Sequence, residues 1–258
     1  MQITGGEIVA WLGTLLWPLF RIGAMMTIAP VFGAQSVPVR IRVVLALAIT
    51  MVAMPMLPAV PQVELFSADS LLIIVQQILI GMMMGLAVQV VFNAVITGAQ
   101  VIAMQMALGF SLMVDPQNGA QVPVLSQLYV LLVTLVYLAV DGHLILIDIL
   151  VQSFVTMPIA VDGLVPRDLL QVVYWGAQIF AGAVIIALPA IASLLVVNLA
   201  FGVMTRAAPQ LNIFAVGFPI TMMLGFGVIL ATLPSVAPQA MSLFDAAHEV
   251  IRQVGTRG

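Results

Sequence analysis

Histidine and cysteine are the first side chains to consider for catalysis, and this chain has few of them. It contains two histidines, His143 and His248, and no cysteine. A membrane zinc protease needs two histidines one helical turn apart beside a glutamate, because both imidazoles must reach one metal ion. Neither histidine has such a neighbour, so we interpret both as solvated side chains of a loop or tail. Cysteine nucleophiles and cysteine metal sites are excluded.

Other catalytic motifs are missing from the sequence as well. No Gly-x-Ser-x-Gly occurs, and Gly225-Phe226-Gly227 is followed by Val228 where an aspartyl protease would need an aspartate. Phosphate-binding glycine loops are also absent. We therefore expect a protein that is not an enzyme and that uses no cofactor and no metal.

Two aspartates are the only acids at the edges of apolar segments that could couple protons. Asp141 and Asp148 are seven residues apart and would share one helical face. Such a pair could serve a proton-coupled small-solute transporter, since acids inside membrane segments often mark ion pathways. Helix capping and a salt bridge to a neighbour explain the same residues, and both interpretations stay open.

The composition predicts a membrane protein. Hydrophobic residues make up 63% of the 258 residues and charged residues only 7%, against about 25% charged in soluble domains. Seven arginines, no lysine and a net charge of −3 leave no basic stripe for phosphates, so nucleic acid is not an expected partner. Glu7 is followed directly by a long apolar run, so we expect no cleaved secretory signal.

Uncharged stretches define the candidate membrane segments. A helix needs about 20 apolar residues to cross a hydrocarbon core of about 30 Å. Shorter candidates are 8–31, 43–57 and 122–157, and longer uncharged stretches lie between Asp69 and Asp115, between Asp168 and Arg206, and between Arg206 and Asp245. We predict an all-α, polytopic membrane protein of about six hydrophobic helices, kinked where Pro189 and Pro219 interrupt them.

Arginines give limited information on orientation. Arg40 and Arg42 are expected in one loop and Arg206 in another, and all three favour the cytoplasmic side. Arg21 lies within the first apolar run, where a charge cannot face lipid. Either its side chain reaches an aqueous edge, or it pairs inside the protein or with a partner subunit.

Polar residues recur at roughly helical spacing in the second half of the stretch after Asp69. They are Asn93, Thr97, Gln100 and Gln105. Unpaired amides in lipid cost several kcal/mol each, so this stripe must face other helices or a wet cavity. It is either an interhelical hydrogen-bonding face or the wall of a conduit.

A Gly-x-x-x-Gly pattern lies in the first half of the same stretch. Gly81 and Gly85 are separated by three methionines. Two glycines one helical turn apart allow another helix to approach closely, so we interpret them as a packing site.

Residues 107–123 cannot form a continuous helix. Asp115 precedes Pro116 and is thereby steered away from helical dihedrals, and Asn118-Gly119 is a tight-turn dipeptide. The first part of this loop is apolar. Either the loop packs inward or it is a partly buried hairpin at the membrane interface, since irregular backbone at membrane depth requires protein or water around it.

The order of particular residues along the chain indicates more about this protein than its composition does. The stretch 21–49 has Arg21, Ala29-Pro30, Gly33, Val37-Pro38, Arg40 and Arg42, and 206–220 reads RAAPQLNIFAVGFPI. Together with Asn93, Gly98, Gln100 and the loop at 107–123, these motifs resemble the FliR family of type III secretion export-gate subunits. The resemblance covers nearly the whole chain, and its specificity lies in the order of the motifs.

The resemblance implies a noncatalytic subunit of the flagellar export gate. It would assemble with FliP and FliQ, beside FlhB, into a channel for unfolded flagellar proteins at the basal body in the bacterial inner membrane, in contact with membrane lipid. The family pattern also implies one integral membrane domain over 1–258, with a FliP-like part at 1–170 and a FliQ-like hairpin and tail at 171–258. An injectisome homologue is the alternative within the same architecture.

The loop corresponds by position to the plug of the family, here 106–121. The resemblance assigns channel closure to Gly109, Phe110, Leu112, Met113, Asp115, Pro116 and Gly119. Arg21, Arg206, Asn93 and Gln100 are its candidates for pairing or subunit contacts.

Overall fold

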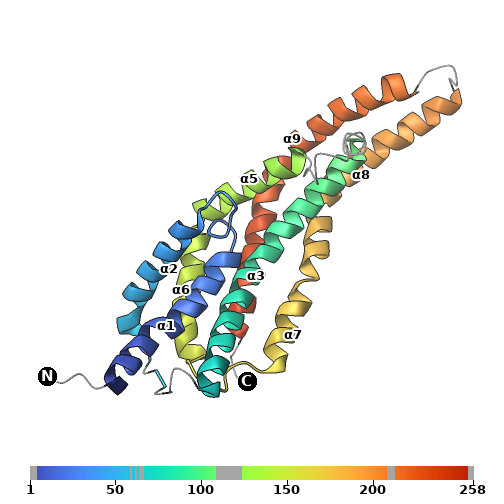
Figure 1. Cartoon of the computed structure of the whole chain (residues 1–258). Helices are drawn as coiled ribbons and strands as arrows, with labels where there is room; N and C mark the ends of the chain where they lie inside the picture. The colour runs from blue at the N-terminus through green and yellow to red at the C-terminus, as the bar shows by residue number, and fades with distance from the viewer. Residues whose placement is uncertain are drawn as a thin grey trace. The chain divides into compact units, whose positions relative to one another are not determined.

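The computed structural model describes residues 5–58, 60–61, 63, 67–108, 124–207 and 213–254, and within these ranges the regular elements are all helices. Figure 1 shows their course. They are α1 (Gly5–Ile28), α2 (Val39–Ala53), the short 3₁₀ helix η1 (Met54–Met56), α3 (Ala68–Gln105), α5 (Val124–Ala139), α6 (Gly142–Thr156), α7 (Pro166–Trp175), α8 (Gln178–Ala207) and α9 (Ile213–Gln253).

Several helical segments are long and apolar enough to cross a membrane. Four of them lie in the described ranges, at Val39–Met56, Ala68–Gln105, Pro166–Met204 and Pro219–Gln253. The pair α5 and α6, bent by 61° at the break between them, can act as a fifth span, and α1 is a shorter apolar helix. The predicted all-α, polytopic membrane fold is confirmed.

Prolines and caps explain where several helices begin and end. Pro38 precedes α2, and Pro55 lies in η1, where the regular helix has already stopped. Pro166 is the first residue of α7, a position where its missing N–H costs nothing. The carboxylate of Asp168 accepts a hydrogen bond of 3.2 Å from the Val165 N–H, which caps the same helix.

Three positions differ from the sequence-based prediction. Arg40 and Arg42 lie in the first two turns of α2, and Arg206 in the last turn of α8, so none of them is a loop residue. The helices extend further than the apolar runs because a helix can carry charged residues at its ends without exposing them to lipid.

Pro189 lies within α8 and Pro219 within α9, so neither proline ends its helix.

The chain divides into two compact units that do not follow its order. The first unit comprises Met1–Val90, Asp141–Gly176 and Phe244–Gly258, and the second comprises Val91–Val140 and Ala177–Leu243. In the first unit α2 lies beside α1 (Figure 1). The Trp175 indole N–H donates a 2.9 Å hydrogen bond to the Ala87 carbonyl, which ties α7 to α3 in that unit.

Close contact between α1 and α3 depends on the two glycines of the Gly-x-x-x-Gly pattern. A Cβ on Gly81 would collide with the backbone carbonyl oxygen of Arg21 and lie 3.0 Å from the Ala24 Cβ. On Gly85 it would lie 3.0 Å from the Ala29 nitrogen and the Met25 oxygen. The α3 backbone therefore packs directly against α1.

Small residues also set the contact between α3 and α8 in the second unit. A Cβ on Gly98 would lie 3.0 Å from the Ala183 carbonyl oxygen, and a Cβ on Gly182 would lie 3.0 Å from the Ala94 Cβ. Gly98 belongs to α3 and Gly182 to α8, so each helix has a glycine at the point where the other helix approaches it. Phe92 and Tyr137 add an edge-to-face ring contact between α3 and α5, with centroids 5.8 Å apart.

Replacing Gly81 by alanine is expected to destabilise the fold by about 1–3 kcal/mol, because the backbone it meets cannot move aside without shifting a helix. Gly23, in α1, is the matched control, since a Cβ there meets nothing within 4 Å. Gly23→Ala should be neutral or stabilising by up to about 1 kcal/mol through helix propensity. Equilibrium unfolding in mixed detergent micelles measures both, and equal effects of the two variants would contradict this packing.

Candidate functional site

A fully buried arginine lies in the first unit. Arg21 of α1 has 0% exposure and contacts two other helices. Its Nε donates a hydrogen bond of 2.8 Å to the Gln77 side-chain oxygen on α3. Its Nη1 donates to the Ser153 carbonyl at 3.0 Å and to the Ser153 hydroxyl at 2.9 Å, and its Nη2 donates to the Met157 carbonyl at 2.9 Å.

The end of α6 explains how this charge is tolerated. Ser153 lies in the last turn of α6 and Met157 is its C-cap, so both carbonyls belong to the negative end of the helix. The guanidinium also lies 4.2 Å from the centre of the Phe154 ring, a favourable cation–π distance. The described partners of Arg21 are thus carbonyl, hydroxyl, amide and aromatic groups, and the side chain does not reach an aqueous edge.

The sequence did not predict any of the groups that surround Arg21, and Gln77 is the one that lies on α3. Its side chain has 0% exposure, and its Nε2 has no hydrogen-bond partner among the residues that the structure describes. The only signal in the sequence was the arginine itself, because a buried charge requires polar groups on the neighbouring helices. The sequence did not show which helices would supply these polar groups, because that depends on the tertiary fold.

The predicted polar stripe belongs to the second unit. Asn93, Thr97, Gln100 and Gln105 are all partly buried on α3. Gly98, on the same part of α3, is buried against Ala183 of α8. The stripe therefore borders the tightly packed α3–α8 contact and keeps some exposure of its own.

The start of the predicted plug loop has a defined geometry. After α3 ends at Gln105, Ala107 adopts a left-handed φ of 62°. The Leu108 N–H donates to the Ala103 carbonyl and the Ala107 N–H to the Met104 carbonyl, both at 3.0 Å. These two bonds form a Schellman motif, which stops a helix and turns the chain away from its axis.

The Met106 side chain secures this turn within the second unit. Met106 has 0% exposure, and its side chain occupies the space where Gly225 of α9 lacks a Cβ. The residues to which the resemblance assigns channel closure lie outside the described residues. They are Gly109, Phe110, Leu112, Met113, Asp115, Pro116 and Gly119.

The two aspartates that could couple protons are both exposed. Asp141 is exposed at the turn before α6, and the exposed Asp148 accepts a 2.7 Å hydrogen bond from the Gln152 amide. Arg206 is exposed at the end of α8. Both histidines correct the prediction of solvated loop or tail side chains, since His143 is half-buried in the first turn of α6 and His248 lies in α9 with 5% exposure. The helix runs on to Gln253 and packs this residue inside the first unit.

Within the described ranges, no group of three or more histidines or acids is arranged to hold a metal ion. The buried polar atoms of the Arg21 site connect helices, and none of them is a nucleophile paired with a base. The site therefore fixes the positions of α1, α3 and α6.

Comparison with known proteins finds relatives that match nearly the whole chain. The family described as bacterial export proteins, family 1, matches residues 12–247. The chain is 39% identical to the flagellar biosynthetic protein FliR of Escherichia coli K12, over 98% of this chain and 97% of that protein. It is 36% identical to FliR of Pectobacterium carotovorum, over 97% and 96%. FliR of Bacillus subtilis is 29% identical over 93% of this chain and 95% of its own length.

Replacing Arg21 by methionine is expected to lower the free energy of unfolding by about 3 kcal/mol or more. The variant leaves the Gln77 side-chain oxygen and the Met157 carbonyl without their described donor, whereas the Ser153 carbonyl keeps the Met157 N–H. Each unpaired buried polar group costs about 1–3 kcal/mol. Arg21→Lys should lose less, because an ammonium keeps the charge and part of the bonding. The control Arg206→Met, at an exposed site, should change stability by less than about 0.5 kcal/mol. Detergent unfolding curves that coincide for the two methionine variants would show that the buried network contributes nothing.

Proposed function

This chain belongs to the family of bacterial export proteins, family 1, and from this premise we propose that it is a noncatalytic subunit of the flagellar type III secretion export gate. The observation that carries the proposal is the near full-length match to proteins named as flagellar biosynthetic proteins FliR. The relatives compared above all carry the flagellar name, which supports the flagellar system over the injectisome. A role in the cell membrane at the flagellar basal body follows from the same proposal.

The exposed surface of the second unit supports assembly with other membrane subunits. α8 has 30 residues, which rise about 45 Å and exceed a hydrocarbon core of about 30 Å. Large apolar side chains are exposed along its length, among them Phe180 at 71%, Leu188 at 56% and Leu199 at 68%. Lipid tails cannot cover the whole of such a surface, so other apolar helices are needed.

We assign these helices to FliP and FliQ, with FlhB as a further neighbour in the export apparatus. In this proposal residues 1–170 are FliP-like and residues 171–258 form a FliQ-like hairpin with its tail. The helices then enclose a channel with the sister subunits, and unfolded flagellar proteins pass through it. In this proposal Asn93 and Gln100, which are partly exposed, and the exposed Arg206 contribute to contacts in that assembly.

The loop 106–121 closes the resting channel in this proposal. Its first residue, Met106, is held against Gly225, and the Schellman motif directs the chain away from α3. Export then requires the apolar residues Phe110, Leu112 and Met113 to leave the passage. The glycines Gly109 and Gly119 allow the backbone to change direction.

Co-purification tests the assembly. Tagged FliP, expressed with this chain and FliQ, is expected to retain the chain through detergent extraction and size-exclusion chromatography. The double variant Asp141→Asn/Asp148→Asn should be retained equally, because the proposal gives these acids no part in transport. A chain that elutes as a monomer and moves a small solute in proteoliposomes would refute the gate proposal.

Loop substitutions test the closure. Gly109→Val and Gly119→Val restrict the backbone and are expected to change both small-solute leak and secretion of flagellar proteins. Gly202→Ala is the control, since a Cβ at Gly202 of α8 meets nothing within 4 Å. Assembled gates in which both loop variants match the control in leak and in secretion would show that the loop is not the plug.

A further inference from the structure

The connection between α1 and α2, residues 29–38, contains a strained turn. The Phe32 N–H donates a 2.9 Å hydrogen bond to the Pro30 carbonyl, and Val31 between them has a φ of 72°. A hydrogen bond across three residues with this φ is the mark of a γ-turn of the rare and strained kind. Valine is an outlier at positive φ, because its branched side chain crowds the backbone there. Contacts elsewhere in the connection must therefore hold the turn in place.

Two contacts hold the connection in this conformation. At the end of α1 the Gly33 N–H donates a 2.8 Å hydrogen bond to the Ala29 carbonyl. A Cβ on Gly33 would lie 2.5 Å from the Thr27 carbonyl oxygen, so the backbone there is packed directly on the helix end. On the other side the Arg42 Nη2 donates a 2.7 Å hydrogen bond to the Ala34 carbonyl, which ties the connection to α2.

Arg42 is only partly satisfied by this arrangement. Its side chain is half-buried, and its Nε is buried without a hydrogen-bond partner in the described part of the chain. A buried donor without an acceptor is unfavourable, because it has lost its bond to water. The unpaired Nε and the strained Val31 both raise the free energy of the observed conformation, and both belong to the same short segment.

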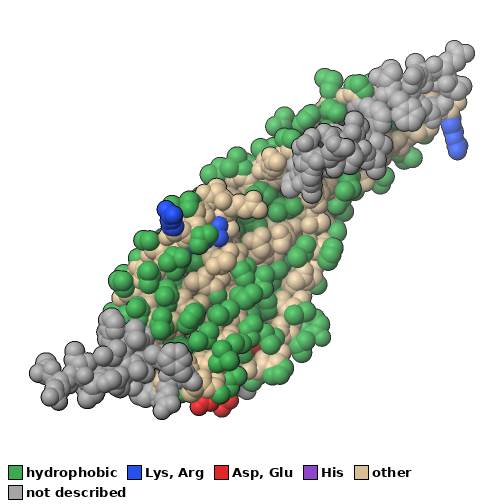
Figure 2. Space-filling view, in the orientation of Figure 1, with side chains coloured by type: hydrophobic (Ala, Val, Ile, Leu, Met, Phe, Trp, Pro, Cys, Tyr) green, Lys and Arg blue, Asp and Glu red, His purple; other side chains and the backbone are tan. Residues whose placement is uncertain are grey.

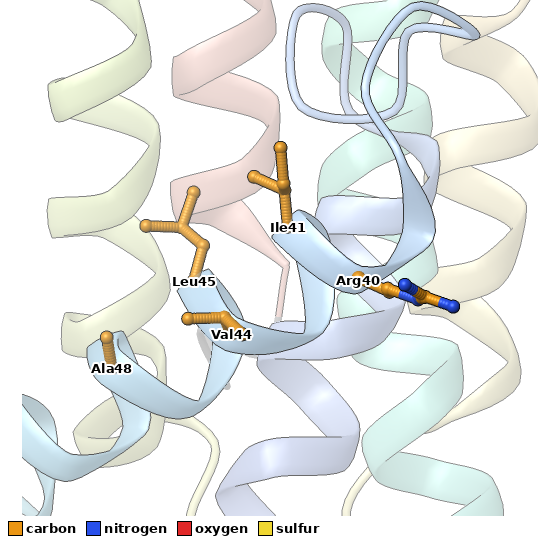
Figure 3. A pocket seen from close by; sticks show the side chains of 5 residues that line it. All are labelled: Arg40, Ile41, Val44, Leu45 and Ala48. Atoms are coloured by element: carbon orange, nitrogen blue, oxygen red, sulfur yellow. The ribbon is translucent and has the colours of Figure 1, made fainter.

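The helix α2 is attached to the first unit through its second half. Its buried residues are Ala46, Thr50 and Ala53. In the first half, 39–45, every side chain except Arg42 is exposed. An open hollow of about 370 Å³ runs along the start of α2, and in Figure 3 the apolar side chains that line it form a row on this helix. Figure 2 shows a largely hydrophobic surface around the same place. Among the side chains of 39–45, Arg42 is therefore the contact that holds this half in place.

We propose that the hydrogen bond between Arg42 and the Ala34 carbonyl is a latch on a movable helix. When the bond opens, Val31 returns to a negative φ, the Arg42 Nε becomes free to bond, and the first half of α2 moves away from α1. The second half stays packed and acts as the pivot. A turn that served only to join two helices could carry glycine at position 31, because glycine adopts positive φ at no steric cost. Valine instead stores strain that favours opening, and strain of this kind is typical of switch segments.

The test uses the purified full chain in detergent micelles, without partner subunits. The chain has no cysteine, so pairs of introduced cysteines can carry spin labels at defined sites. The pair Val44→Cys and Leu86→Cys reports the distance from the first half of α2 to α3, and the pair Val52→Cys and Leu86→Cys does so for the second half. All three positions are exposed. Double electron–electron resonance measures the distances and their populations.

Arg42→Met removes the latch. It is expected to raise the ratio of long to short Val44–Leu86 distances about tenfold, the effect of losing one hydrogen bond from a charged group. The Val52–Leu86 distance should stay unchanged. Arg40→Met is the matched control, because Arg40 is an exposed arginine in the same turn of α2, and it should change neither distance.

Glycine substitutions test the stored strain. Val31→Gly, added to Arg42→Met, should lower the ratio again, because glycine keeps the turn without strain. Val37→Gly is the control, since Val37 is half-buried in the same connection but has no positive φ, and it should not lower the ratio. In the otherwise unchanged chain, Val31→Gly should unfold at a higher temperature than Val37→Gly. This comparison tests the strain even where Arg42→Met does not fold.

Three outcomes would overturn the proposal. They are equal distance ratios for Arg42→Met and Arg40→Met, equal effects of Val31→Gly and Val37→Gly, and a Val52–Leu86 distance that shifts as far as the Val44–Leu86 distance. In the last case α2 would move as a whole, without a pivot in its second half. The measurements need no sister subunit, so the latch and the export-gate role are tested independently.

Discussion

The buried guanidinium of Arg21 determines how the first unit is built, and no carboxylate among the described residues is paired with it. Burying a charge costs several kcal/mol unless polar groups replace the lost water. Arg21 obtains these groups from the C-terminal end of α6, from the amide of Gln77 and from the face of Phe154. The negative end of a helix stands in for an anion, and α1, α3 and α6 must keep their relative positions for this to work.

The fold also depends on close packing of helix backbones, and glycines provide it in both units. Helices in lipid gain little from the hydrophobic effect, so they depend on van der Waals contact and interhelical hydrogen bonds. Gly81 and Gly85 allow α3 to approach α1 in the first unit, and Gly98 and Gly182 bring α3 and α8 together in the second. A Cβ on Gly81 would collide with the carbonyl of Arg21, so the packing and the buried charge depend on the same contact.

The remaining apolar surface connects this architecture to export. α2 and α8 expose large aliphatic and aromatic side chains along their length. On α8 the exposed surface is longer than a bilayer requires, whereas the length of α2 nearly matches a bilayer. Close helix contacts inside the chain and apolar faces outside it accord with the proposed role in a larger membrane assembly.

The sequence by itself determined the local features of this protein. Apolar runs predicted membrane helices and the Gly81–Gly85 spacing predicted a packing face, because each property depends on residues within one or two helical turns. The motif order also indicated the family. Only the tertiary structure placed Gln77, Ser153 and Met157 around Arg21, since they are 56 to 136 positions away along the chain. Burial of His248 was decided in the same way, because burial depends on the helices that pack around a residue.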